Sequence, residues 1–295
     1  MATRQTGVDL GTGYLGCPIW GLKDWVGNFF PAGAKQRDFL TLYSRRLNTV
    51  EGNTTFYAIP SAETVERWRD ETPPGFKFCL KFPKVITHQL RLRNAEAKTQ
   101  EFLDRLQRLG DRRGPSFLQL PPNFGRTNLQ SLISYLDSLP NDFQYAVEVR
   151  HLDFFSDPGE AALDEALRAR GVARVLFDVR GLRSAEPKDE ATVTAQERKP
   201  NVPVRFTRTV PFAFVRYIAH PQINANAALL DDWAERVSAW LAAGDDVFFF
   251  LHSPTDVLSP VLARELHTRL TTRHLLPPLP AWNAEPPAPK QSSLF

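Results

Sequence analysis

Polar side chains that can carry chemistry recur near the C-terminal ends of the strand-like runs in this sequence. In seven of eight runs the alternating set ends in ionisable or amide groups, namely Glu51, Asn53, Lys81, Gln119, Glu148, Arg150, Asp178, Arg216 and His252. For any one residue, packing as a buried ion pair and a functional role explain the pattern equally well. The repetition favours function, because burying a charge costs several kcal/mol unless the charge is well paired.

Four of these residues are candidates for catalysis. Glu51 and Lys81 come from adjacent runs, so we expect an ion pair between them, although a desolvated lysine would instead be a nucleophile. Glu148 and Asp178 also come from neighbouring runs, and two adjacent carboxylates can share a proton or bind a metal ion. All four groups are predicted to act as acids, bases or electrostatic stabilisers.

A metal site is the less favoured interpretation of the carboxylates. His151, His220 and His252 are available as further ligands beside Glu148 and Asp178. However, no HxH or HExxH spacing is present, and a lone histidine is more often a hydrogen-bonded loop residue than a ligand. No cofactor is predicted, and a divalent metal ion is kept as the alternative.

The basic residues of the same set indicate an anionic ligand. Arg150, Arg216 and Lys81 would suit a phosphate or carboxylate group, because guanidinium groups hold such anions through two hydrogen bonds. Phe56 and Tyr57 can offer rings to a base or sugar, though ordinary packing explains them as well. The sequence therefore predicts a phosphate-containing ligand.

Strand-like runs alternate with amphipathic helical stretches along the chain, which is the pattern of βα units in a parallel sheet. The eight runs are VDLGTG (8–13), TVEGNTTF (49–56), FKFCLKF (76–82), SFLQLP (116–121), YAVEVR (145–150), RVLFDV (174–179), FAFVRYI (212–218) and VFFFLH (247–252). In a closed barrel the polar set of each run would point inward and emerge at the C-terminal mouth, where barrel enzymes place their active sites. We therefore predict a single (β/α)8 TIM-type barrel over residues 1–275.

Two segments depart from this pattern. Residues 180–210 are polar and contain Pro187, Pro200 and Pro203, so we expect a long excursion over one end of the sheet, either as a lid or as surface decoration. Residues 276–295 are dense in proline and have no apolar period, which predicts a flexible, poorly ordered tail.

Composition narrows the class of protein. The chain has 295 residues, 42% of them hydrophobic and 23% charged, as in globular proteins. No apolar run approaches the ~20 residues that cross a bilayer, and the N-terminus lacks a signal-peptide core, so we expect a cytoplasmic protein without membrane contact. Cys17 and Cys79 form no CxxC spacing, which argues against a disulfide framework. The net charge of +3 does not by itself indicate nucleic-acid binding.

Several longer motifs resemble the YecE-like family, the domain of unknown function numbered 72, which forms TIM-type barrels. The motifs are GNFFP (27–31), TVEGNTTFYAIPS (49–61), WRDETPPGFKFCLKFPKVITH (68–88), FLQLPPNF (117–124) and AVEVRH (146–151). The resemblance covers most of residues 7–275 and implies roles for Glu51, Asn53, Tyr57, Lys81, His88, Gln119, Glu148 and Arg150. Together with the strand ends, it gives a predicted substrate-binding set of Asn53, Tyr57, His88, Gln119, Arg150, His151, Arg216 and His252. The sequence departs from the family pattern at GTGYLGCPIW and at LHSP, which bears on Trp20 and His252.

The last five residues, QSSLF (291–295), resemble a short bacterial motif that docks into a groove on the DNA polymerase sliding clamp. Leu294 and Phe295 would be paired apolar anchors and Gln291 a polar one, presented on the proline-rich tether. A disordered end without a partner is an equally good explanation. The motif makes the sliding clamp, and through it DNA, a predicted partner.

Two classes of function follow. The first is an enzyme acting on a phosphate-containing substrate, either nucleic acid or a sugar phosphate, as a phosphoesterase-type hydrolase or a sugar-phosphate enzyme. The second is a non-catalytic module that binds a ligand or nucleic acid and is recruited to the replication machinery by its tail.

Overall fold

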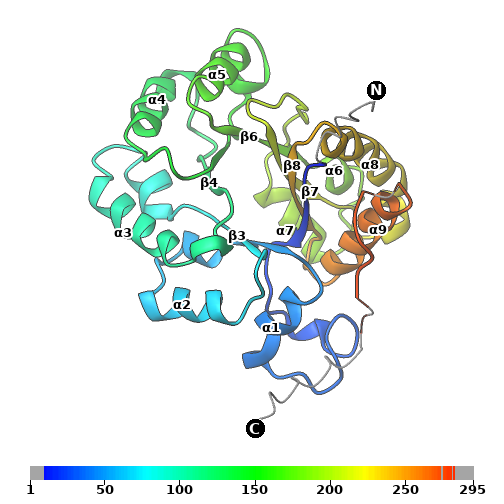
Figure 1. Cartoon of the computed structure of the whole chain (residues 1–295). Helices are drawn as coiled ribbons and strands as arrows, with labels where there is room; N and C mark the ends of the chain where they lie inside the picture. Colours follow the sequence, from blue (N-terminus) through cyan, green and yellow to red (C-terminus); the bar gives the residue numbers. More distant parts are fainter. Residues whose placement is uncertain (1–9, 274, 281, 283–295) are drawn as a thin grey trace, which may run out of the picture.

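Eight parallel strands form a nearly closed barrel with helices around it (Figure 1). The structure is a computed structural model that describes residues 10–273, 275–280 and 282. The strands are β1 (Gly13–Cys17), β2 (Thr49–Gly52), β3 (Lys77–Leu80), β4 (Ser116–Gln119), β5 (Tyr145–Glu148), β6 (Ala173–Asp178), β7 (Phe212–Ile218) and β8 (Asp246–His252). The predicted TIM-type barrel is confirmed.

The order of the strands brings their C-terminal ends to one rim. Neighbouring strands follow the order β3-β2-β1-β8-β7-β6-β5-β4, and the paired strands are parallel. An isolated bridge between Lys81 and Phe117 brings the end of β3 beside β4, where the barrel closes. Residues that follow the strands therefore meet at a single mouth.

The helices surround the strands, as the ring in Figure 1 shows, except that α7 lies at the mouth of the barrel. They are α1 (Phe39–Ser44), α2 (Ala62–Asp70), α3 (Glu96–Gln107), α4 (Leu129–Asp137), α5 (Gly159–Arg168), α6 (Arg180–Arg183), α7 (Glu190–Arg198), α8 (Ala227–Ala242) and α9 (Ser259–Thr271). Ser61 caps α2 by accepting a hydrogen bond from the backbone N–H of Thr64 at 3.3 Å. Val65 and Trp68 form the buried side of that helix.

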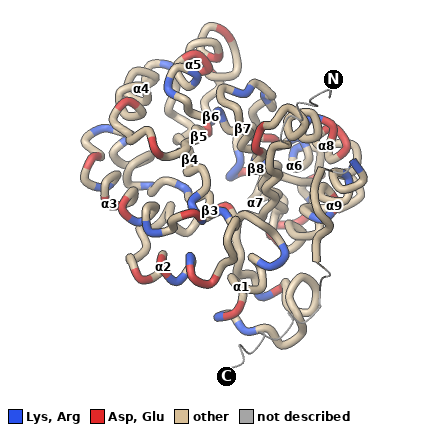
Figure 2. Tube along the Cα trace, viewed as in Figure 1, with Lys and Arg blue, Asp and Glu red and all other residues tan. Residues whose placement is uncertain are grey.

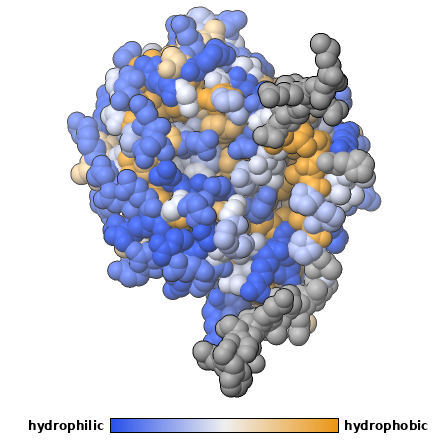
Figure 3. Space-filling view, viewed as in Figure 1, coloured by the Kyte–Doolittle hydropathy of each residue, from blue (hydrophilic) through white to orange (hydrophobic). Residues whose placement is uncertain are grey.

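The surface of the molecule is mainly polar. Figure 3 shows a face that is mostly hydrophilic, with apolar side chains gathered in a band beside α8 and α9. In the described part of the chain, no helix has both the length and the apolar character needed to cross a bilayer.

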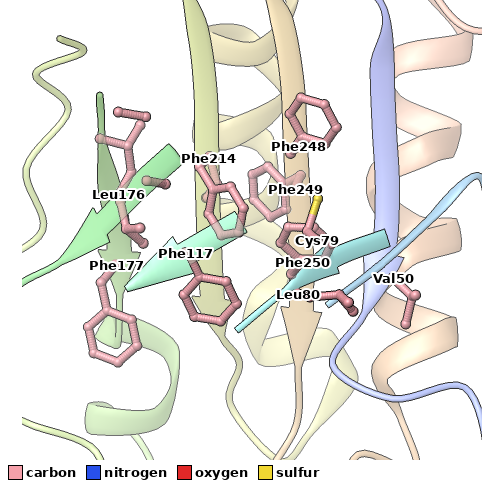
Figure 4. Close-up of a cluster of buried hydrophobic side chains, with 14 of the residues drawn as sticks. Val50, Cys79, Leu80, Phe117, Leu176, Phe177, Phe214, Phe248, Phe249 and Phe250 are labelled. Atoms are coloured by element: carbon pink, nitrogen blue, oxygen red, sulfur yellow. The ribbon is translucent and has the colours of Figure 1, made fainter. Parts of the chain in front are cut away.

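Aromatic side chains from different strands fill the barrel. The ring centroids of Phe117 on β4 and Phe214 on β7 lie 5.2 Å apart, and those of Phe214 and Phe250 on β8 lie 5.1 Å apart. Figure 4 shows these rings turned toward one another, and all three are fully buried. The interior is therefore a packed core rather than a pore, and the polar groups of the mouth lie directly above these aromatic rings.

The first strand begins later than the sequence predicts. The predicted run is 8–13, of which residues 8 and 9 lie outside the described residues, whereas β1 spans Gly13–Cys17. The glycines of this segment mark close backbone approach: a Cβ on Gly16 would lie 2.3 Å from the carbonyl oxygen of Thr49 on β2. Glycine here permits tight strand pairing, and the prediction wrongly ended the strand at Gly13.

The connection between β6 and β7 is long, as predicted, and contains the helices α6 and α7. Asp189 caps α7 by accepting hydrogen bonds from the backbone N–H and the hydroxyl of Thr192, at 2.8 and 2.7 Å. Several residues of α7 line the cavity at the mouth of the barrel. The excursion therefore covers the end of the barrel at which the polar strand ends emerge.

The described part of the proline-rich tail, residues 276–280 and 282, lies against the barrel. Nε2 of His267 on α9 donates to the carbonyl oxygen of Pro277 at 2.7 Å. The ring centroids of Trp282 and Phe29 lie 5.1 Å apart, edge to face. The Arg264 guanidinium lies 4.0 Å from the Trp282 ring centroid. The tail is thus attached to the barrel as far as Trp282.

Candidate functional site

Arg216 on β7 lies at the centre of a buried ion cluster. Its Nε and one terminal nitrogen donate to the two carboxylate oxygens of Glu51 on β2, both at 2.7 Å, and its other terminal nitrogen donates to Glu148 on β5. Glu51 and Glu148 have no exposed surface, and Arg216 is 2% exposed. One guanidinium thus joins two carboxylates from different strands, in the bidentate geometry that makes such pairs strong.

Strand register explains why these charges meet. Gln119 on β4 pairs with Glu148 on β5, and Phe177 on β6 pairs with Arg216 on β7, so all four side chains share the inner face near the mouth. The Arg216 guanidinium lies 5.2 Å from the ring centroid of Phe117, one layer below. The ion cluster therefore forms the topmost layer of the barrel interior.

Two further cations, Arg150 and Lys81, lie around Gln119. Arg150 donates to Glu148 Oε1 through Nε at 2.7 Å and to Gln119 Oε1 through a terminal nitrogen at 2.7 Å. Lys81, which follows β3, donates from Nζ to the same Gln119 oxygen at 2.8 Å. Two cations therefore converge on one neutral amide oxygen. In Figure 2, Lys and Arg positions lie at the centre of the ring beside β3 and β7.

The surroundings of Lys81 favour its neutral form. Burial, followed by the charge of Arg216, lowers the pKa of Lys81 to about 7, although Glu148 partly opposes the shift. Its amine lies 4.0 Å from the ring centroid of Phe56, which shields one side from water. Lys81 therefore exchanges a proton near neutral pH, as an acid, base or nucleophile requires.

The two glutamates behave differently. Burial alone would raise the pKa of Glu148, but Arg216 and Arg150 outweigh it and hold that pKa at about 2. Likewise, Arg216 and His252 hold the pKa of Glu51 well below its usual range despite burial. Both carboxylates are therefore ionised at neutral pH, and they orient Arg216 rather than carry protons.

Asn53 and His252 complete the surroundings of Glu51. Asn53 Nδ2 donates to Glu51 Oε1 at 2.7 Å and to the Pro18 carbonyl oxygen at 3.1 Å. Nε2 of His252 lies 3.1 Å from Glu51 Oε2, and burial lowers the pKa of this histidine. We assign the Nε2 proton from this contact, because an ionised carboxylate can only accept.

A cavity of about 810 Å³ opens above this cluster. Its floor and walls include the polar residues Asn53, Lys81, Gln119, Arg150, Lys199, Arg216 and His252. Glu51 and Glu148 do not line it, because they lie beneath the cations that they hold. The lining also includes Asp189, Glu190 and Asp256, so the cationic and amide donors are concentrated above the ion cluster rather than around the whole cavity.

The predicted pairs of catalytic residues are not formed. Glu51 pairs with Arg216 instead of Lys81, because the arginine reaches across the barrel and makes two hydrogen bonds at once. Asp178 does not join the mouth at all: it accepts from the indole of Trp233 on α8 at 2.8 Å and pairs with Arg180.

The position of Asp178 follows from which residues of β6 point into the barrel. Phe177 pairs with the inward-facing Arg216, so Asp178 pairs with the outward-facing Tyr217. The Arg150 and Arg216 guanidiniums lie 5.7 and 5.8 Å from the Phe177 ring centroid. The prediction assigned the residues of β6 to the wrong faces, shifted by one residue. The Asp178 carboxylate therefore points toward the helices and not into the barrel.

The remaining predicted residues lie around the rim. Tyr57 lines the cavity with its side chain largely exposed at 81%. The His88 ring packs edge to face on Phe56 at 5.1 Å, and burial with the nearby Lys81 lowers its pKa to about 4. His151 accepts a hydrogen bond at Nδ1 from the Asp153 backbone at 3.2 Å and does not line the cavity.

Metal ligands do not gather in the part of the chain that the structure describes. No group of three or more His, Cys, Asp or Glu side chains there is arranged to hold a metal ion. Glu51 and Glu148, the carboxylates of the buried ion cluster, already use both oxygens on Arg216, Arg150, Asn53 and His252.

Sequence analysis missed Lys199 as a member of the site. It directly follows α7 and lines the cavity from the side opposite the strand ends. Burial, together with Arg216 and Arg150, lowers its pKa to about 8. Nothing in the polar segment 180–210 distinguishes this lysine, because its place depends on how the excursion folds over the barrel.

The predicted clamp-binding residues Gln291, Leu294 and Phe295 lie outside the described residues. The role of this motif stays a prediction.

Known proteins share both the sequence and the fold. The family model described as "Protein of unknown function DUF72" matches residues 14–287. The UPF0759 protein YecE of Escherichia coli strain K12 is 39% identical over 283 residues, which cover 96% of this chain and 99% of that protein. The UPF0759 protein YunF of Bacillus subtilis strain 168 is 26% identical over 152 residues, 49% of this chain and 53% of that protein.

Solved structures agree on the fold. The crystal structure of a DUF72 family protein from Thermotoga maritima MSB8 superposes with a TM-score of 0.68 at 23% identity, covering 89% of this chain and 99% of the other. One from Enterococcus faecalis V583 gives a TM-score of 0.66 at 18% identity, covering 88% of this chain and 96% of the other. The family model and the full-length YecE match together establish that this chain belongs to the DUF72 family of YecE-like proteins.

Proposed function

We propose that the mouth of the barrel is an active site for a small substrate that carries a phosphate group. The main support is the convergence of Lys81 and Arg150 on one oxygen of Gln119, at 2.8 and 2.7 Å. Within the described residues Lys81 has no carboxylate partner, so its positive charge is not compensated at the cavity floor. An anionic group bound there would replace water as the acceptor and form charge-assisted hydrogen bonds.

Lys81 is the acid–base or nucleophilic group of this proposal. Its pKa of about 7 lets the amine be neutral or cationic near neutral pH. Arg150 and Arg216 bind and orient the anion, and Glu51 and Glu148 hold the arginines in place. The reaction is therefore acid–base or transfer chemistry beside a phosphate, as in sugar-phosphate enzymes and phosphoesterases.

The size of the cavity favours a small substrate. Its volume of about 810 Å³ falls within the roughly 300–1,000 Å³ of small-molecule sites. A sugar phosphate fits such a space directly, whereas a nucleic acid would have to insert a single nucleotide unit. We therefore prefer the sugar phosphate among the two substrate classes.

Binding of sulfate should depend on pH through Lys81. Sulfate stays a dianion between pH 5 and 9, so only the protein titrates. Because Lys81 is cationic below its lowered pKa of about 7, sulfate affinity should be constant near pH 6. Above pH 7 binding must take up a proton, and the dissociation constant should rise by up to about tenfold per pH unit. Titration calorimetry at pH 6, 7, 8 and 9 measures this slope.

Two outcomes of the sulfate titration are decisive. The Lys81→Met variant should lose this slope, so that its sulfate affinity is nearly insensitive to pH between 6 and 7.5. A wild-type affinity that stays flat up to pH 9 would contradict the assignment of Lys81 to the anion site.

We propose separately that the C-terminal tail recruits the barrel to the sliding clamp. Trp282 packs on Phe29, and the motif residues Gln291, Leu294 and Phe295 come nine to thirteen positions later in the sequence. Purified clamp should retain the full chain in a pull-down and should fail to retain a chain ending at Lys290. Equal retention of both chains would exclude the motif. Clamp binding without turnover of any phosphoester would favour the non-catalytic alternative.

A further inference from the structure

The segment between β6 and β7 forms a unit held together by its own hydrogen bonds. Arg183 on α6 donates to the carbonyl oxygen of Gln196 on α7 at 2.7 Å and to that of Lys199. In the opposite direction, Nε2 of Gln196 donates to the carbonyl oxygens of Leu182 and Ala185, at 3.0 and 2.9 Å. Among the described residues, no hydrogen bond or ion pair joins 185–203 to the strands or to the outer helices.

Ion pairs fix the two ends of this unit. At its start, Arg180 pairs with Asp178 at 2.8 Å and with Asp232 on α8 at 3.1 Å. After its end, Arg205 donates from Nε to both oxygens of Glu160 on α5, at 2.7 and 2.9 Å. Residues 185–203 therefore lie between two anchors and are attached to the mouth only by packing, so they can move as one body.

Beside Arg198, Lys199 is the second cation that this unit places in the cavity lining. It is half-buried and lines the cavity, yet within the described residues its amine has no hydrogen-bond acceptor and no ion pair. It lies close enough to Arg150 and Arg216 for their charges to lower its pKa. The amine is therefore free to bind an anion that enters the cavity, through a charge-assisted hydrogen bond.

The cavity also has acidic residues. Asp189 and Glu190 line it at the end of α7 opposite Lys199, and the Asp189 carboxylate is engaged in capping Thr192. Asp256, which follows β8, also lines it, accepts a hydrogen bond from the Ser259 hydroxyl at 3.3 Å, and lies close enough to Lys199 for the lysine charge to act on its pKa. Along α7, an anionic group that touches the excursion is therefore directed to the Lys199 end.

We propose that residues 185–203 form a lid and that Lys199 is its anion-binding residue, so that the ligand carries two anionic groups. One group would lie against Lys81 and Arg150 on the barrel floor, and the other against Lys199 on the lid. The cavity of about 810 Å³ has room for such a bridging ligand and is larger than one phosphate requires. The inference rests on the proposed function and narrows its substrate class to small dianionic compounds of the bisphosphate or phosphate–carboxylate type.

The test compares inorganic phosphate with propane-1,3-bisphosphonate on the full-length protein. Wild type should bind the bisphosphonate about tenfold or more tighter than phosphate, because a second charged contact is added. Lys199→Met should lose about tenfold in bisphosphonate affinity and less than about twofold in phosphate affinity, and Lys199→Arg should retain most of both. Lys188→Met, which alters an exposed lysine of the same excursion, is the matched control and should change neither.

Closure of the lid has an independent readout. A Glu-specific protease can cut the excursion after Glu190 and Glu197, which none of the lysine substitutions alters. The bisphosphonate should slow this cleavage in wild type and in Lys188→Met but not in Lys199→Met, while phosphate should slow it little in any of them.

The results of these binding experiments distinguish the lid role of Lys199 from the proposed function on which it rests. Equal bisphosphonate affinity in wild type and Lys199→Met would overturn the lid role of Lys199, and so would an equal loss of phosphate and bisphosphonate affinity, which would place Lys199 in the floor site. Phosphate binding that does not change in Lys81→Met would overturn the proposed function and this inference together.

Discussion

Replacing Arg216 by methionine should destabilise the protein by about 3–5 kcal/mol, the usual cost of leaving buried charges without their partner. Arg216 is 2% exposed and pairs with two carboxylates that have no exposed surface. Without it, Glu51 would keep only Asn53 and His252 as partners, and Glu148 only Arg150. Urea denaturation followed by circular dichroism measures the change in the free energy of unfolding.

Two controls distinguish the ion cluster from a general effect of losing an arginine. Arg67→Met removes an exposed guanidinium that pairs with Glu71 on the surface of α2, and it should cost less than about 1 kcal/mol. Adding Glu51→Gln and Glu148→Gln to Arg216→Met removes the unpaired charges and should recover a large part of the loss. A free energy of unfolding for Arg216→Met within about 1 kcal/mol of wild type would show that the cluster does not need its arginine.

Much of the site could be predicted because β-strands alternate strictly between two faces. The position of Glu51, Lys81, Gln119 and Glu148 on the inner face near the mouth follows from counting by two along strands whose ends are visible in the sequence. The family motifs indicate the same residues. What the alternation predicts well is therefore which strand residues meet, and that prediction is confirmed for these four.

The partners within the site could not be predicted in the same way. Counting by two requires one residue whose face is already known. The sequence of β6 does not provide such a residue, because apolar side chains occupy both of its faces. Asp178 was therefore placed inside, although the pairing of Phe177 with Arg216 turns it toward α8. The choice of Arg216 over Lys81 as the partner of Glu51 depends on reach across the barrel, which no spacing along the chain encodes.

Residues outside the strands escape the alternation altogether. Lys199 enters the cavity because α7 folds back over the mouth, and the polar sequence of the excursion carries no apolar period that would give this orientation. A three-dimensional arrangement of distant segments was needed to identify it.

Replacing Lys81 by methionine should weaken anion binding by about 10- to 100-fold, the effect of losing one charge-assisted hydrogen bond of about 1.5–3 kcal/mol. Methionine keeps the unbranched side chain against the Phe56 ring but removes the amine that donates to Gln119. Because burial of the lysine already opposes its charge, the variant should be at least as stable as wild type below pH 7. Loss of binding would then not reflect unfolding.

The central claim is that the mouth binds an anion at the Lys81 amine. Its most direct test is titration calorimetry of sulfate at pH 6 with wild type, Lys81→Met and Lys98→Met, the last an exposed lysine on α3 paired with Glu101. We predict one sulfate per chain for wild type and Lys98→Met with equal affinity, and at least tenfold weaker binding for Lys81→Met. Equal affinity in all three proteins, or no sulfate bound by wild type, would contradict the claim.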